Sequence, residues 1–158
     1  MAGNRSIGFF GTSDLEISGD IGDAGKGFGL ILNGASDRSL TVSGNNTYTG
    51  DTVSNGTILV IGTTGVIAAG SDVIINGPGE LRGTGTILGQ VISNAGQIAP
   101  GLSPGTLTAG ALNFDNETRV FIELDIPTSD QLVVNNSVSL GNAGLDAILE
   151  SDIPVGTE

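Results

Sequence analysis

Cysteine, histidine and tryptophan are absent from this chain of 158 residues, and aromatic residues make up only 4% of it. Without cysteine the chain forms no disulfide bond and no thiolate metal site. Without histidine it lacks the side chain that most often serves as a general base near neutral pH. What remains is rich in glycine, in small polar residues and in valine, isoleucine and leucine, which favours a narrow aliphatic core with tight corners.

Positive charge is also scarce, because five lysine and arginine residues stand against 17 acidic ones, a net charge of -12. Nucleic acids and anionic membranes need clustered cations, so we expect no nucleic-acid partner. No apolar run is long enough to span a bilayer as a helix. Met1–Arg5 is not followed by the apolar core of a signal peptide, so we expect that, if the parent protein is exported, this chain is a piece of it.

The segment Gly83–Leu107 is the most informative part of the chain. Short apolar pieces alternate there with glycine and asparagine, and the segment ends in two Pro-Gly pairs, Pro100-Gly101 and Pro104-Gly105. A helix does not survive that density of glycine and proline, and a β-sandwich usually has longer strands between turns. Short strands with frequent corners predict an all-β solenoid. We expect one domain over residues 1–158 with almost no helix.

The apolar residues come in pulses separated by turn dipeptides such as Asn55-Gly56 and Asn76-Gly77. Many pulses alternate with a period of two, as strands do. Pulses recur every 15 to 18 residues between residues 40 and 107, so we expect coils of about 20 residues, about seven of them, with parallel pairing between Ile58–Ile61 and Val73–Ile75 and asparagine ladders at the corners. The pattern leaves antiparallel hairpins open, chiefly near the C-terminal end.

Three segments carry a family resemblance. Gln97–Thr108 resembles the Pro-Gly-x-Ser-Pro-Gly-Thr-Leu signature of autotransporter passenger domains. Leu40–Val53 and the strand that follows it, Asn55–Val60, resemble the autotransporter-associated β-strand repeat. Ser129–Asn135 is similar to the Ser-Asp-x-Leu-x-Val segment that follows such repeats. The segments occur in the family's order and together cover roughly residues 40–149.

The resemblance implies a right-handed, single-stranded parallel β-helix with N-terminal coils over residues 1–39, repeat coils over 40–111 and C-terminal coils over 112–158. It implies a cell-surface stalk of a Gram-negative type V secretion system, whose natural partner is its own C-terminal outer-membrane barrel. Its expected site is a structural corner made of Pro100, Gly101, Ser103, Pro104 and Gly105. Folding of the last coils would help to draw the chain outward.

Candidate chemistry is sparse. The carboxylate pairs Asp14/Glu16 and Glu123/Asp125 each share a strand face, but both fit an outward solvated face, and we expect no catalytic residue. The segment Gly19–Gly25 is only faintly similar to calcium-binding repeats, so we expect no metal and no cofactor.

Two other functions stay open. An adhesin would bind a host surface protein or glycan through the faces of its coils, for which Phe9-Phe10 and Phe121 are the only hints. A solenoid with an uncovered C-terminal coil would associate end to end into a surface filament, or fray from that end.

Overall fold

The computed structural model describes residues 3–102, 104–125 and 127–149, and this part of the chain consists of strands and turns without a helix. The fold is a parallel β-solenoid of about six turns, which confirms the predicted fold class. Ser103, one of the expected corner residues, lies outside the described residues.

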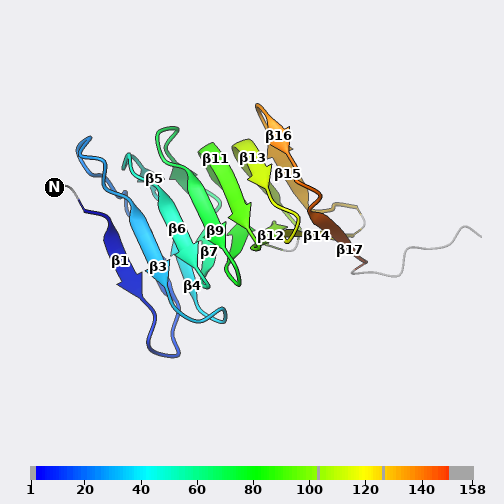
Figure 1. Ribbon diagram of the computed structural model, residues 1–158, viewed down its shortest axis with the longest axis horizontal. Helices are drawn as coiled ribbons and strands as arrows, with labels where there is room; N and C mark the ends of the chain where they lie inside the picture. The colour runs from blue at the N-terminus through cyan, green and yellow to red at the C-terminus, as the bar shows by residue number, and fades with distance from the viewer. Residues whose placement is uncertain (1–2, 103, 126, 150–158) are drawn as a thin grey trace, which may run out of the picture.

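Two sheets run the length of the stack (Figure 1). The ten-stranded sheet contains β1 (Arg5–Gly8), β3 (Leu30–Asn33), β5 (Asn45–Asn46), β6 (Thr52–Asn55), β8 (Val66–Ile67), β9 (Val73–Asn76), β11 (Thr86–Asn94), β13 (Thr106–Phe114), β15 (Gln131–Val134) and β16 (Val138–Ser139). The seven-stranded sheet contains β2 (Leu15–Ile17), β4 (Ser39–Val42), β7 (Ile58–Ile61), β10 (Glu80–Gly83), β12 (Gln97–Pro100), β14 (Arg119–Leu124) and β17 (Gly144–Leu149).

The core is a set of aliphatic ladders between the two sheets. In the seven-stranded sheet one inward position is occupied, coil after coil, by Leu40, Leu59, Leu81, Ile98 and Val120, whose side chains are 0 to 9% exposed. Because strand residues alternate between faces, the neighbouring positions point outward and are free to carry polar residues. Each coil therefore rests on the coil before it through stacked aliphatic side chains.

An asparagine ladder follows one edge of the ten-stranded sheet, as expected. The side-chain amide of Asn55 donates to the Oδ1 atom of Asn33 (3.0 Å), Asn76 donates to Asn55 (2.9 Å) and Asn94 donates to Asn76 (2.9 Å). These residues end β6, β9 and β11, and Asn33 ends β3. The ladder thus fixes where four successive strands stop.

The predicted pairing between Ile58–Ile61 and Val73–Ile75 is wrong. β7 pairs with β4 and β10, whereas β9 pairs with β6 and β11. Each coil places one strand in the seven-stranded sheet and one or more in the ten-stranded sheet, so the next apolar pulse along the chain lies across the core, and the pairing partner is about two pulses away. The stack has about six turns, where the sequence predicted about seven.

Coil length varies along the stack. Leu81 pairs with Ile98, 17 residues on, whereas Leu112 pairs with Val138, 26 residues on. Every strand pair among the described residues is parallel, so the C-terminal hairpin that the sequence left open does not occur in them.

Candidate functional site

The predicted corner closes the turn between β12 and β13. Pro100 and Gly101 are buried, whereas Pro104 is exposed. Gly101 exchanges two backbone hydrogen bonds with Gly83, the last residue of β10 on the preceding coil: its N–H donates to the Gly83 carbonyl (2.9 Å) and its carbonyl accepts from the Gly83 N–H (3.2 Å). Both glycines have positive φ, +98° and +120°, a conformation that costs an L-residue strain. The Pro-Gly pair therefore locks the corner onto the coil beside it.

Asp130 joins this corner to the following coil. Its Oδ1 accepts a hydrogen bond from the Gly105 N–H (2.9 Å), and its Oδ2 accepts one from the Glu123 N–H (3.1 Å). The residue is 8% exposed. A Cβ added at Gly101 would lie 2.0 Å from the Asp130 Oδ1 atom, so only glycine fits beneath the carboxylate. We call this arrangement the Asp130 clamp.

Sequence reasoning assigned no role to Asp130, although its segment was part of the resemblance. The carboxylate lies 25 residues from Gly105 along the chain, and only the coiling brings them together. The available signal was an aspartate directly before an apolar strand, in a chain where such aspartates recur.

Other carboxylates also accept hydrogen bonds from a neighbouring coil. Asp14 accepts from the Ser39 N–H (2.8 Å) and Asp20 from the Asn45 N–H (2.7 Å). Glu16 accepts from the Ser43 hydroxyl (3.2 Å). The predicted pair Asp14/Glu16 thus binds the neighbouring coil, and each side chain has its own partner there.

Two carboxylates hold turns through several donors at once. Asp23 accepts from the N–H groups of Gly25 and Phe28 and from the Thr49 hydroxyl. Desolvation acts to raise the pKa of Asp23, but these hydrogen bonds outweigh it and hold the pKa far below its ordinary value. The segment Gly19–Gly25 thus forms a turn whose carboxylates accept hydrogen bonds from its own backbone and from that of the neighbouring coil.

Asp115 plays the same part at the end of β13. Burial acts to raise its pKa, but hydrogen bonds from Thr118, Ala95 and Glu117 lower the pKa below its ordinary value of 3.8. The Ala95 N–H belongs to the preceding coil, so this carboxylate also links two coils.

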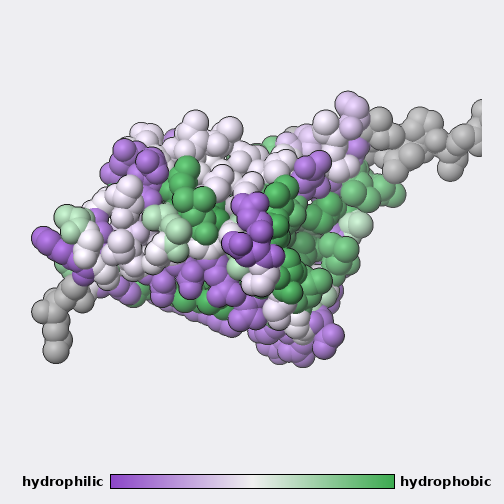
Figure 2. Space-filling view, turned by 90° about the horizontal axis from the view of Figure 1, so that it is seen from above, coloured by the Kyte–Doolittle hydropathy of each residue, from purple (hydrophilic) through white to green (hydrophobic). Residues whose placement is uncertain are grey.

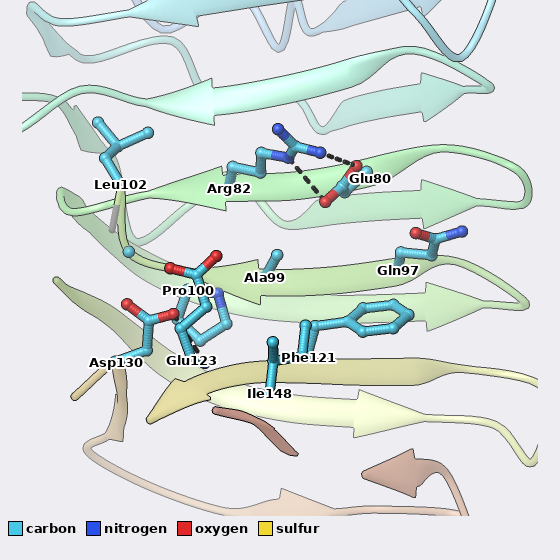
Figure 3. A pocket seen from close by; sticks show the side chains of 11 residues that line it. Glu80, Arg82, Gln97, Ala99, Pro100, Leu102, Phe121, Glu123, Asp130 and Ile148 are labelled. Carbon is cyan, nitrogen blue, oxygen red and sulfur yellow. Dashed lines mark hydrogen bonds and ion pairs between the residues drawn. The ribbon is translucent and has the colours of Figure 1, made fainter. Parts of the chain in front are cut away.

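A cleft of about 450 Å³ lies on the outward face of the seven-stranded sheet beside the corner (Figure 3). Its floor includes Ala99 on β12, which lies between Arg82 on β10 and Phe121 on β14. Arg82 binds Glu80 through two hydrogen bonds, from Nε to Oε1 (2.7 Å) and from Nη2 to Oε2 (2.9 Å). These bonds raise the pKa of Arg82, so the guanidinium stays charged.

The remaining walls of the cleft are mixed. Gln97, Glu123 and Asp130 add polar groups, and Leu102 and Ile148 add apolar ones. Leu102, from the Pro-Gly corner, is 55% exposed. The structure therefore brings the predicted corner and two residues singled out from the sequence, Phe121 and Glu123, to one place. It does not bring Phe9 or Phe10 there.

The last coil exposes apolar side chains. Leu145 extends the ladder of Leu81 and Val120 yet is 69% exposed, and Leu149 and Leu140 are 62% and 55% exposed. Figure 2 shows hydrophobic side chains gathering towards this end of the stack.

Among the described residues no group of three or more histidine, cysteine, aspartate or glutamate side chains is placed to hold a metal ion. The same part of the chain contains no helix long and apolar enough to cross a membrane. No family model matches this chain, and neither a curated protein nor a solved structure matches it.

Proposed function

We propose that this chain is a structural stalk from the passenger of an autotransporter, which presents other segments away from the outer membrane of a Gram-negative bacterium. The observation that carries the proposal is the Asp130 clamp. The Pro-Gly signature around Gly101 and the Ser129–Asn135 segment are separate pieces of the resemblance, and in the fold they meet through one carboxylate. A working contact between the two motifs gives a physical reason for both to occur in one chain.

The solenoid suits display because it is an extended stack whose coils depend only on their neighbours. Each coil that docks buries residues such as Leu81 and Val91, both fully buried, and a fully buried aliphatic side chain contributes about 1.5–3 kcal/mol. Coil-by-coil folding outside the cell would then oppose backward movement of the chain through a secretion pore.

In this proposal the C-terminal coil is the side that faces the membrane-anchored part of the system. The exposed side chains of Leu140, Leu145 and Leu149, together with the open edges of β16 and β17, would be covered there by that part or by another copy of the stack. We propose no catalytic activity for the chain.

A secretion assay tests the proposal. The chain would carry an epitope at its N-terminus and would be placed between a cleavable signal peptide and a type V outer-membrane barrel. Surface display would be measured by the sensitivity of the epitope to external protease. We expect the wild-type chain to expose the epitope, and D130A to leave a larger fraction in the periplasm at equal expression.

A control with Asp51→Ala, which removes one exposed hydrogen bond to the Asp72 N–H, should display the epitope like the wild type. Equal display by the wild type, by D130A and by a barrel that carries a flexible linker in place of this chain would refute the stalk function.

A further inference from the structure

The cleft beside the Pro-Gly corner lies on the outward face of the seven-stranded sheet, outside the aliphatic core. Its floor belongs to one outward column of the seven-stranded sheet, which runs through Thr41, Val60, Arg82 and Ala99, and Phe121 on the next strand lies beside Ala99 (Figure 3). Ala99 has the smallest side chain of this column, so the surface dips between its two large neighbours. β10 and β14 lie two strand spacings apart, about 9.6 Å.

The lining combines apolar side chains with polar groups. Phe121, Leu102 and Ile148 supply the apolar part, and their side chains are at least partly exposed. Glu80 is held by its two hydrogen bonds to Arg82, and only 12% of its side chain is exposed, whereas 47% of the Arg82 side chain is exposed. Preformed concave sites that bind small ligands have this composition: an apolar lining with a few oriented polar groups.

We propose that this cleft binds a neutral saccharide of one to three units, a property that goes beyond the stalk function. A pyranose ring presents a face of C–H groups, which packs against an aromatic ring such as Phe121. Its hydroxyl groups lie around the rim, where carboxylate, guanidinium and amide groups such as those of Glu80, Arg82 and Gln97 accept and donate hydrogen bonds. The volume of about 450 Å³ falls in the range of small-ligand sites.

Other ligands fit less well. The cleft contains one cation, Arg82, beside the carboxylates of Glu80, Glu123 and Asp130, and the net charge of the chain is -12, so an acidic sugar or a phosphate would be repelled. An extended peptide that adds to a sheet needs an open edge, whereas β10, β12 and β14 are paired with neighbours on both sides. A helical peptide docks in a groove through more than one turn. One turn with its side chains, about 10 Å wide and about 5.4 Å long, occupies roughly 420 Å³, so the cleft of about 450 Å³ has room for a single turn only.

An NMR titration of the folded chain tests the proposal. The probes are neutral oligosaccharides built from glucose, galactose, mannose, fucose or N-acetylglucosamine, and trigalacturonate is the acidic comparison. We expect at least one neutral probe to shift backbone amide signals of β10, β12 and β14 around Ala99, with a Kd of about 1 mM or tighter, and trigalacturonate to leave them unchanged.

Ala99→Leu would fill the floor of the cleft while keeping an outward aliphatic side chain, so we expect it to weaken binding at least tenfold. Its matched control is Thr41→Leu, in the same column but outside the cleft, which should bind like the wild type. Arg82→Ala should weaken binding, whereas Arg119→Ala, an outward arginine of the same sheet that is paired with Asp146 (3.4 Å), should not.

The proposal fails if no neutral probe shifts the cleft signals, if trigalacturonate shifts them as strongly, or if Ala99→Leu binds like Thr41→Leu. Circular dichroism of each variant must match the wild type, so that a loss of binding is not a loss of fold.

Discussion

Replacing Asp130 with alanine removes the carboxylate that joins the Pro-Gly corner to the last coils. The substitution deletes two hydrogen bonds from backbone N–H groups to a carboxylate, at Gly105 and Glu123. Hydrogen bonds to charged groups contribute about 1.5–3 kcal/mol each. Because both contacts are partly exposed to solvent, we take the lower end and expect D130A to lower the free energy of unfolding by about 3 kcal/mol.

A double-mutant cycle with Gly101 isolates the clamp from general damage. Gly101→Ala brings a Cβ to 2.0 Å from the Asp130 Oδ1 atom and also strains a backbone at φ +98°. In the D130A background the clash with the carboxylate disappears, and the backbone strain and a close contact of 3.0 Å with the Gly105 nitrogen remain. We therefore expect the double variant to be more stable than the sum of the two single effects predicts, by about 1 kcal/mol or more.

The assay is urea unfolding followed by circular dichroism, combined with amide hydrogen exchange. Exchange at Gly105 and Glu123 should rise more than exchange at Val91, which lies in the middle of the stack. Asp51→Ala serves as the control and should change stability by no more than about 0.5 kcal/mol. Effects of Asp130→Ala and Gly101→Ala that add within about 0.5 kcal/mol would refute the clamp.

Two further predictions concern the aliphatic ladder of the core and the pH dependence of the stability. Leu81→Ala should lower the free energy of unfolding by about 3 kcal/mol, because the Leu81 side chain is fully buried. Leu145 belongs to the same ladder but is 69% exposed, so Leu145→Ala should cost no more than about 0.5 kcal/mol. Equal losses in urea unfolding would contradict the stacked core. The pKa of Asp115 is lowered in the folded chain, so its contribution is present above its ordinary value of 3.8 and is lost as the pH falls through the folded pKa. Asp115→Asn should therefore destabilise the chain at pH 7 and flatten the fall in stability in acid, and identical pH profiles of the unfolding free energy for the two proteins would rule this out.

The sequence predicted the fold class because the evidence for it is local. The density of glycine and proline around Pro100 and Pro104 excludes helix wherever it occurs, and the period-two alternation marks strands without reference to distant residues. The asparagine ladder was also predicted, but from Asn-Gly dipeptides that favour a left-handed corner and not from the asparagine side chains themselves. Of the glycines that follow Asn33, Asn55 and Asn76, only the one after Asn55, Gly56, has a positive φ.

What the coils share at that position is the asparagine side chain itself. Asn94 extends the ladder although alanine follows it, and Ala95 takes the left-handed conformation there with φ 57°. The dipeptide pattern missed this coil because it required a glycine.

The register and the Asp130 clamp were beyond the sequence for one physical reason. Ile58–Ile61 and Val73–Asn76 have nearly the same aliphatic composition, so nothing local tells which pulse belongs to which sheet. Coils of 17 to 26 residues also have no fixed period that would align them. Without the register, Asp130 and Gly105 cannot be recognised as neighbours. The cleft was missed because it arises from a small residue, Ala99, between large ones on adjacent coils.

The parallel stacking of the coils also determines how the chain would respond to force. The two ends of the described chain lie at opposite ends of the stack (Figure 1), and the hydrogen bonds between strands point along the stack. A force applied to both ends therefore breaks these bonds one coil at a time and does not shear many of them at once. Each coil of 17 to 26 residues would release about 60–90 Å of extended chain. The stack would lengthen under load in unequal steps, each as long as the coil that has just come free.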